Sequence, residues 1–234
     1  QQYRGPFGCV RGGTIKNVKF TNVDITADEA VGGVVGLLIE DTSNGTMENV
    51  SVTGSVTATT EKAGGLLGWN HTGDVTNCFT SASVDCTHRT GGAIGYHTTN
   101  SSLNYTVSTG AVTGDTNTGG LTGYATGTTT SSYWDTDTSG WTTSESGVGL
   151  TTSELTGSAA QTNTALDFTN VWTTRDNDYP ELQATASGVL GYRDSSGTAF
   201  AGLPVYYRSP SMEYWSKVPV RYRDSSSTSW MELQ

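Results

Sequence analysis

The chain has 234 residues, a formal net charge of −10 and only four lysines. This acidic balance argues against binding to nucleic acid through phosphates, and no apolar run approaches the length of a transmembrane helix. We therefore expect neither a nucleic-acid partner nor membrane insertion. The excess of acidic residues over lysine suits a salt-rich or extracellular setting.

A glycine motif recurs four times in the first half of the chain. Each copy has two glycines, two further residues and a third glycine, and the copies begin at steps of 32, 27 and 28 residues. A fixed period of this size is typical of a repeat architecture rather than of a single globular core. The copies are Gly32–Gly36, Gly64–Gly68, Gly91–Gly95 and Gly119–Gly123.

A second landmark follows the same period. Asn17, Asn49, Asn77 and Asn104 each open a short run in which apolar and polar residues alternate, which predicts strands with one buried face. Helix formers are sparse. From this alternation we expect Val18, Val50, Cys78 and Tyr105 to stack as one inward row.

A unit of about 28 residues with two or three short strands cannot bury a face alone, so successive units must stack. We therefore predict an all-β fold, a short β-solenoid (β-helix) of about four coils followed by a small β-hairpin repeat module. The paired glycines are expected to supply corners with positive φ. A β-sandwich is the alternative, because glycine-rich turns and alternating strands also suit it.

The motif resembles the GLUG repeat of filamentous-haemagglutinin-like adhesins and other extracellular proteins. The resemblance extends over residues 13–183 and implies an extracellular solenoid architecture more than a function. The first copy departs from the pattern, because Leu37–Ile39 replaces the usual aromatic residue and asparagine. The segments that carry it are Ala63–Asn70, Gly73–Phe79, Ser132–Gly140, Gly147–Thr152, Val171–Trp172 and Tyr179–Leu182.

The C-terminal part has a second, 15-residue period. Tyr192, Tyr207 and Tyr222 fall at identical steps, and each unit reads as a strand, a serine-rich turn and a strand, which predicts a hairpin. This segment loosely resembles the Trp-ending hairpin repeats of virion fibre proteins. The predicted organisation is a cap or linker at 1–12, the solenoid at 13–130, a capping or closing segment at 131–186 and the hairpin module at 187–234.

Residues for catalysis or metal binding are few. Two carboxylate pairs, Asp74 with Asp85 and Asp176 with Asp178, have no basic partner in a recognisable frame, so we predict no catalytic residues and no cofactor.

Asp135 and Asp137 resemble the start of a calcium loop, but position twelve is Ser146 instead of Glu. We favour an Asp-capped turn there, with calcium as the alternative.

Cysteines are predicted to be structural. Cys78 and Cys86 are expected to face inward, and on an extended run they would lie roughly 26 Å apart, beyond disulfide reach. Cys9 has no assignable partner.

Aromatic residues form the candidate binding row. Leu37, Trp69, Tyr96 and Tyr124 each follow the third glycine of a copy, and Tyr133 and Trp134 would continue the row. If the row faces outward, it forms a ladder that contacts sugar rings or a partner protein; if it faces inward, it is core. The alternation alone does not decide between the two, because the same face carries Val35, Leu67 and Ile94, which would normally be buried.

Together these observations predict a non-enzymatic attachment protein that contacts a host surface glycan or glycoprotein. We expect a virus tail fibre or spike on the virion surface, associated with other structural subunits and assembled as a trimer. A secreted or cell-surface adhesin and a polysaccharide depolymerase are the alternatives. The predicted interface residues of the trimer or of the contact with the solenoid are Tyr207, Trp215, Tyr222 and Trp230.

Overall fold

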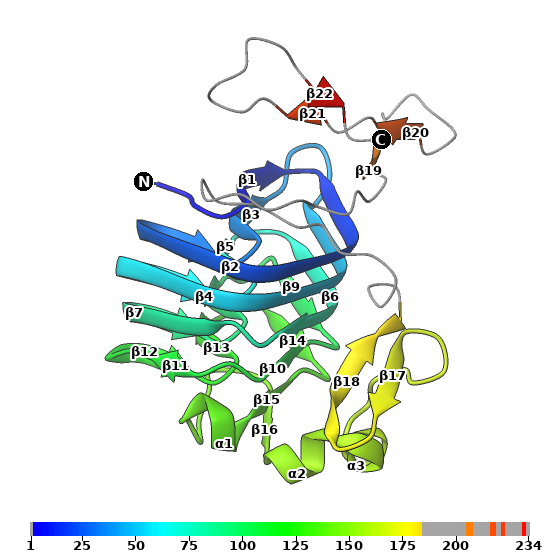
Figure 1. Ribbon diagram of the computed structural model, residues 1–234. Helices are drawn as coiled ribbons and strands as arrows, with labels where there is room; N and C mark the ends of the chain where they lie inside the picture. The colour runs from blue at the N-terminus through cyan, green and yellow to red at the C-terminus, as the bar shows by residue number, and fades with distance from the viewer. Residues whose placement is uncertain (1, 184–204, 208–215, 219–220, 223–230, 233–234) are drawn as a thin grey trace. The chain divides into compact units, whose positions relative to one another are not determined.

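The computed structural model describes residues 2–183, 205–207, 216–218, 221–222 and 231–232. The chain is mostly β, and Figure 1 shows its first part as a solenoid of about five coils, which confirms the predicted class. Two compact units are present, Gln1–Val189 and Leu190–Gln234.

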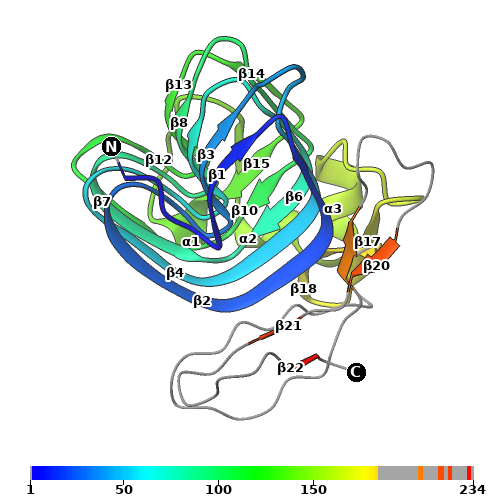
Figure 2. The ribbon, with the colours of Figure 1, turned by 90° about the horizontal axis from the view of Figure 1, so that it is seen from above.

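Parallel strands stack into two sheets, and Figure 2 shows successive coils lying over one another. The first sheet has the order β1 (Phe7–Arg11), β3 (Val35–Ile39), β5 (Leu67–Asn70), β8 (Ile94–His97) and β13 (Thr122–Ala125). The second sheet wraps around the solenoid and contains β2 (Thr14–Gly32), β4 (Thr46–Gly64), β6 (Asp74–Thr80), β7 (Ser83–Gly91), β9 (Ser102–Asn104), β10 (Val107–Ser108), β11 (Val112–Thr113), β12 (Thr116–Gly119), β14 (Thr128–Thr130), β15 (Tyr133–Asp135) and β16 (Val148–Leu150).

The stacking register confirms three members of the predicted inward row and corrects the fourth. Val18 lies opposite Val50, and Val50 lies opposite Cys78. In the next coil Asn104 pairs with Thr76, so Tyr105 takes the place of Asn77 instead of that of Cys78. The prediction for Tyr105 was wrong because this residue forms the corner itself, with φ of 50° and a 37% exposed side chain.

Asparagine forms this same corner in three other coils, and the paired glycines do not adopt positive φ. Asn17, Asn49 and Asn77 adopt φ of 52–56°, the left-handed region that asparagine tolerates. Positive φ occurs in the described residues at five glycines, none of which belongs to the repeated motif. The expectation of glycine corners was therefore wrong.

The paired glycines instead allow the coils to approach one another. A Cβ at Gly33 would lie 2.2 Å from the carbonyl oxygen of Gly65, and a Cβ at Gly65 would lie 2.4 Å from that of Gly92. Only glycine fits where backbone meets backbone in this way.

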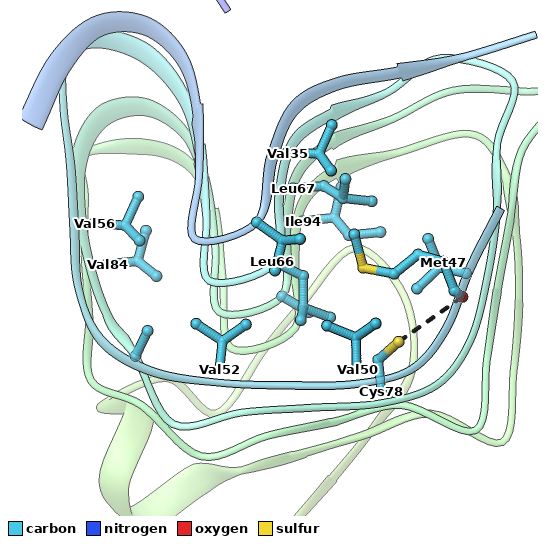
Figure 3. Close-up of a cluster of buried hydrophobic side chains, with 14 of the residues drawn as sticks. Val35, Met47, Val50, Val52, Val56, Leu66, Leu67, Cys78, Val84 and Ile94 are labelled. Carbon is cyan, nitrogen blue, oxygen red and sulfur yellow. Dashed lines mark hydrogen bonds between the residues drawn. The ribbon is translucent and has the colours of Figure 1, made fainter. Parts of the chain in front are cut away.

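Two hydrophobic clusters hold the first unit together. The larger fills the solenoid, where Val52, Val56, Leu66 and Leu67 point inward from different sides of the coil (Figure 3). The chain dips towards the interior at Leu66, which is fully buried at the base of this fold-back (Figure 3). The burial of such side chains, about 1.5–3 kcal/mol each, stabilises the stack.

A closing segment supplies the second cluster. It contains α1 (Thr136–Ser139), α2 (Thr152–Leu155), α3 (Gly157–Asn163) and the antiparallel pair β17 (Trp172–Arg175) and β18 (Asp178–Leu182). Leu155, Trp172 and Leu182 pack here against Val107 and Tyr133 of the second sheet. The segment therefore covers part of the outer surface of the solenoid, and Figure 1 shows the β17–β18 pair beside it.

In the second unit two short antiparallel pairs are described. β19 (Val205–Tyr207) pairs with β20 (Ser216–Val218), and β21 (Arg221–Tyr222) pairs with β22 (Met231–Glu232). Among the helices of the described part, none is long and apolar enough to cross a membrane.

Candidate functional site

The candidate site lies where each coil folds back on itself at its glycine pair. The limb before the pair and the strand after it are packed backbone to backbone: a Cβ at Gly68 would lie 2.4 Å from the carbonyl carbon of Ala30. Side chains from both limbs meet at the rim of this fold-back. We call the set the fold-back ladder; its members are Glu29, Glu61, Lys62, Trp69, Arg89, Tyr96 and Tyr124.

The aromatic members are in register, as the sequence predicts. Leu37 lies opposite Trp69, Trp69 opposite Tyr96, and Tyr96 opposite Tyr124. The Trp69 and Tyr96 rings are stacked at 5.5 Å between centroids with 26° between planes. Tyr96 and Tyr124 are 5.4 Å apart with their planes at 63°. Leu37 is buried, whereas the three aromatic side chains are half-buried.

Charged side chains from the opposite limb complete the ladder. The Lys62 ammonium pairs with Glu29 at 2.6 Å and also with Glu61, and Arg89 pairs with Glu61. Lys62 also lies 5.3 Å from the ring centroid of Trp69, and the Arg89 guanidinium lies 5.1 Å from that of Tyr96. Each cation is therefore held both by a carboxylate and by an aromatic ring, an arrangement that fixes its position.

The aromatic side chains of the ladder point away from the interior, because the residues that follow Trp69 and Tyr96 along their strands point into it. Asn70 and His97 are fully buried and occupy the inward positions next to Trp69 and Tyr96. The Asn70 amide donates to the carbonyl oxygen of Gly73, and the Ser101 hydroxyl lies 2.7 Å from Nδ1 of His97. Burial lowers the pKa of His97.

Ring geometry decides what the ladder can contact. Trp69 has Tyr96 and Lys62 against it, with His71 at 5.2 Å between centroids, and Tyr96 has Trp69 and Arg89. Because neighbours occupy the faces of Trp69 and Tyr96, a ligand would meet their ring edges, the Tyr96 hydroxyl and charged groups there. Tyr124 meets Tyr96 edge to face.

Tyr133 and Trp134 do not extend this ladder. Their side chains are only 6% and 5% exposed. Tyr133 accepts a hydrogen bond from the backbone N–H of Ala165, and the Trp134 indole donates to the carbonyl oxygen of Trp141. Both residues lie on β15 of the second sheet and not on the sheet that carries the ladder aromatics. Tyr133 is buried under the closing segment, and Trp134 belongs to the core of the solenoid.

Asp135 is a buried structural carboxylate. One oxygen accepts from the backbone N–H groups of Asp137 and Thr138 and caps α1, and the other accepts from the hydroxyls of Thr152 and Tyr179 at 2.7 and 2.6 Å. Asp137 accepts from the backbone N–H of Thr152. This is the Asp-capped turn favoured above, and the described residues contain no group of three acidic, histidine or cysteine side chains arranged for a metal.

The other carboxylate candidates are exposed or take part in structural contacts. Asp74 accepts hydrogen bonds from Asn44 and Ser102 of the neighbouring coils, whereas Asp85 is exposed on β7. Asp176 is exposed in the turn between β17 and β18, and Asp178 forms an ion pair with Arg175 at 3.5 Å. Asp74 therefore ties coils together.

All three cysteines are free. Cys78 and Cys86 are buried, as predicted, and Cys86 lies opposite Ala58. Burial raises the pKa of Cys78 to about 12, so its thiol stays protonated. Cys9 is exposed.

The predicted interface residues lie in the second unit. Tyr207 ends β19 and Tyr222 ends β21, while Trp215 and Trp230 lie outside the described residues. Their predicted contacts therefore stay predictions.

Sequence reasoning missed the charged half of the fold-back ladder. Lys62 and Arg89 fall at one repeat position, two residues before each glycine pair, where Ala30 and Asn117 are their counterparts. All four adopt positive φ in the structure. The signal in the sequence was the basic residue that recurs at this position in two of the copies.

Comparison with known proteins found a family motif, a related sequence segment and a similar solved structure. Residues 27–57 match the family described as the GLUG motif. Over 74 residues the chain is 38% identical to halomucin from Haloquadratum walsbyi (strain DSM 16790 / HBSQ001), which amounts to 31% of this chain and 1% of that protein. A crystal structure of a Bacteroides ovatus protein, provisionally described as an immunoglobulin A1 protease, aligns with a TM-score of 0.49 and 18% identity over 70% of this chain and 56% of that one.

Proposed function

We propose that this chain is a non-enzymatic attachment module of a secreted or cell-surface protein, and that it contacts a surface glycan or glycoprotein. The observation that carries the proposal is the fold-back ladder, in which a rigid stack holds three half-buried aromatic side chains in register and places Lys62 and Arg89 against two of them. The GLUG motif, the similarity to a halomucin segment and the acidic composition support an extracellular setting.

The ladder suits an extended partner. Successive coils repeat the same position at a spacing of about 4.8 Å, so a polymer lying along the solenoid meets similar groups at each step. Several weak contacts along one rigid surface then act together. Because the faces of Trp69 and Tyr96 are occupied, the contacts at these two rings are hydrogen bonds to the Tyr96 hydroxyl and to charged groups.

The cellular setting is better supported than the virion. Neither the motif nor the halomucin segment points to a tail fibre or spike, and the virion hypothesis rests only on the 15-residue period at the C-terminus. We therefore place the adhesin-like function first and keep the tail fibre as the second candidate.

A binding assay with matched variants tests the proposal. The full chain is applied to immobilised surface polysaccharides and mucin-type glycoproteins, and Tyr124→Ala is compared with wild type. Tyr124 ends the aromatic row, and its removal should weaken binding about tenfold, equal to about 1.4 kcal/mol. Tyr105→Ala is the control, because this exposed tyrosine lies at a corner outside the ladder. Binding that is unchanged in Tyr124→Ala, or lowered equally in Tyr105→Ala, would contradict the proposal.

The depolymerase alternative has its own test. Wild type and the Asp74→Asn and Asp176→Asn variants are incubated with the same polysaccharides, and new reducing ends are measured. We expect no product from any of them. Release of reducing sugar by wild type that either substitution abolishes would show an enzyme instead.

A further inference from the structure

A second surface feature lies on the outside of the second sheet, away from the fold-back ladder. One outward row runs across five coils in register, from Lys19 to Ser51, Phe79, Val107 and Tyr133. The row changes character along its length, from charged through polar to apolar.

The closing segment covers only the apolar part of this row. Val107 and Tyr133 are buried under it, and Phe79 is half-buried at its border. Beyond Phe79, the β17–β18 pair stands over Ser51 and Lys19 and leaves a cavity of about 190 Å³. The pocket is open to solvent on one side, so it suits one sugar ring whose neighbours in a glycan lie outside it.

The walls of this pocket combine apolar surfaces with hydrogen-bonding groups. Phe79 and Tyr179 form one side, with ring centroids 6.3 Å apart and planes inclined at 47°. Pro180 lines the pocket beside them, and the hydroxyl-bearing residues Thr53 and Ser81 line it as well. Aromatic and hydroxyl groups together fit a ligand that has both C–H faces and hydroxyls.

Ser51 is a buried polar residue without a hydrogen-bond partner in the wall of this pocket. Its side chain is only 5% exposed, it lines the pocket, and its hydroxyl has no hydrogen-bond partner. An unmade hydrogen bond at a buried hydroxyl costs about 1–3 kcal/mol. The hydroxyl oxygen is covered in this conformation, so it bonds a ligand hydroxyl once the side chain turns into the pocket.

The charges in the pocket are already balanced. Lys19 binds Glu181 at 3.1 Å, and Arg175 lies 3.6 Å from Glu181 and 3.5 Å from Asp178. Two cations therefore face two carboxylates. An anionic ligand would have to break these pairs, whereas a neutral ligand can accept from the cations and donate to the carboxylates.

The pocket is also held in shape before any ligand arrives. The Tyr179 hydroxyl donates to the buried Asp135, which fixes one aromatic wall against α1. Trp172 of β17 lies opposite Leu182 of β18, and both are buried in the second cluster. A preformed site loses less entropy on binding.

We propose that this pocket binds one neutral sugar ring, a pyranose with free hydroxyls, as the terminal residue of a glycan. The proposal rests on the attachment function given above and assigns its sugar contact to a second surface. Phe79 and Tyr179 contact the C–H faces of the ring, Ser51 completes its hydrogen bond with a ring hydroxyl, and Glu181 and Lys19 bind further hydroxyls.

Nuclear magnetic resonance of the full chain tests the pocket. The ¹⁵N-labelled protein is titrated with methyl glycosides of glucose, galactose, mannose and N-acetylglucosamine, and with glucuronate as the anionic probe. At least one neutral glycoside should shift the amides around Ser51, Phe79 and Glu181, with a dissociation constant of about 1 mM, as for a single sugar held by few contacts.

Two variants and one control sharpen the test. Ser51→Ala should weaken binding about tenfold and should not lower the melting temperature, because it removes a buried hydroxyl that makes no bond in the folded protein. Ser81→Trp fills the pocket and should abolish the shifts. Ser83→Ala removes an exposed hydroxyl outside the pocket and should bind like wild type.

The outcomes distinguish a failure of the pocket proposal from a failure of the attachment function. No shift near Ser51 with any neutral glycoside, or equal affinity in Ser51→Ala, overturns the pocket, and tighter binding of glucuronate overturns its neutral class. If the chain binds immobilised polysaccharide while the pocket stays silent, the attachment function stands without it. If the pocket binds glycosides but no surface glycan is captured, the pocket stands and the attachment function fails.

Discussion

Replacement of Asp135 by alanine removes four hydrogen bonds at once. The carboxylate caps α1 and also holds the hydroxyls of Thr152 and Tyr179. Loss of a helix cap costs about 1 kcal/mol. Each of the two side-chain bonds to this charged group adds about 1.5 kcal/mol. The expected loss is therefore roughly 4 kcal/mol, a large share of the stability of a domain that has only about 5–15 kcal/mol in total.

Thermal unfolding followed by circular dichroism measures this loss. A domain of this size shifts by about 2–4 °C per kcal/mol, so Asp135→Ala should melt roughly 8–16 °C lower. Asp85→Ala, which removes an exposed carboxylate on β7, should stay within about 0.5 kcal/mol of wild type. Equal melting temperatures for the two variants would contradict the inference that Asp135 stabilises the fold by joining α1 to β18.

Three further predictions concern the core, the cysteines and assembly. Val50→Asp places an unpaired charge in the buried inward row and should unfold or aggregate the domain, and a soluble variant with unchanged melting would contradict that row. Because burial raises the pKa of Cys78 from 9.0 to about 12, the unfolded chain loses this proton first. Stability should therefore fall as pH rises from about 9 to 12, by up to about 1.4 kcal/mol per unit, and Cys78→Ala should flatten the fall in urea titrations. Deletion of residues 189–234 should reduce a trimer to monomers in a solution mass measurement; an unchanged oligomer, or a full-length monomer, would contradict assembly through the C-terminal aromatics.

The sequence could predict the solenoid because its period is local. The spacing of the glycine pairs and the alternation around Val18 and Val50 require only neighbouring residues, and the strand register follows them. The role of the glycines could not be deduced in the same way. Gly65 is needed because the carbonyl oxygen of Gly92 lies above it, a contact between residues of different coils.

The candidate sites depended on contacts that spacing does not encode. The aromatic row was predicted by position, but its outward direction depends on how Asn70 and His97 turn inward beside it. The pocket could not be predicted, because it joins Ser51 to Glu181, which are distant in the sequence. Only the packing of the closing segment on the second sheet brings them together.

The parallel stack has a mechanical consequence. Since each coil contacts only the coils next to it, a pull on the chain can strip one coil while the others keep their strands paired. A coil of 27–32 residues releases roughly 90–110 Å of chain when it is extended. A stack of this kind lengthens in steps under load, and the hydrogen bond from Tyr179 of β18 to Asp135 resists the first step from that end. A protein that holds two surfaces together could in this way absorb a sudden strain without releasing either of them.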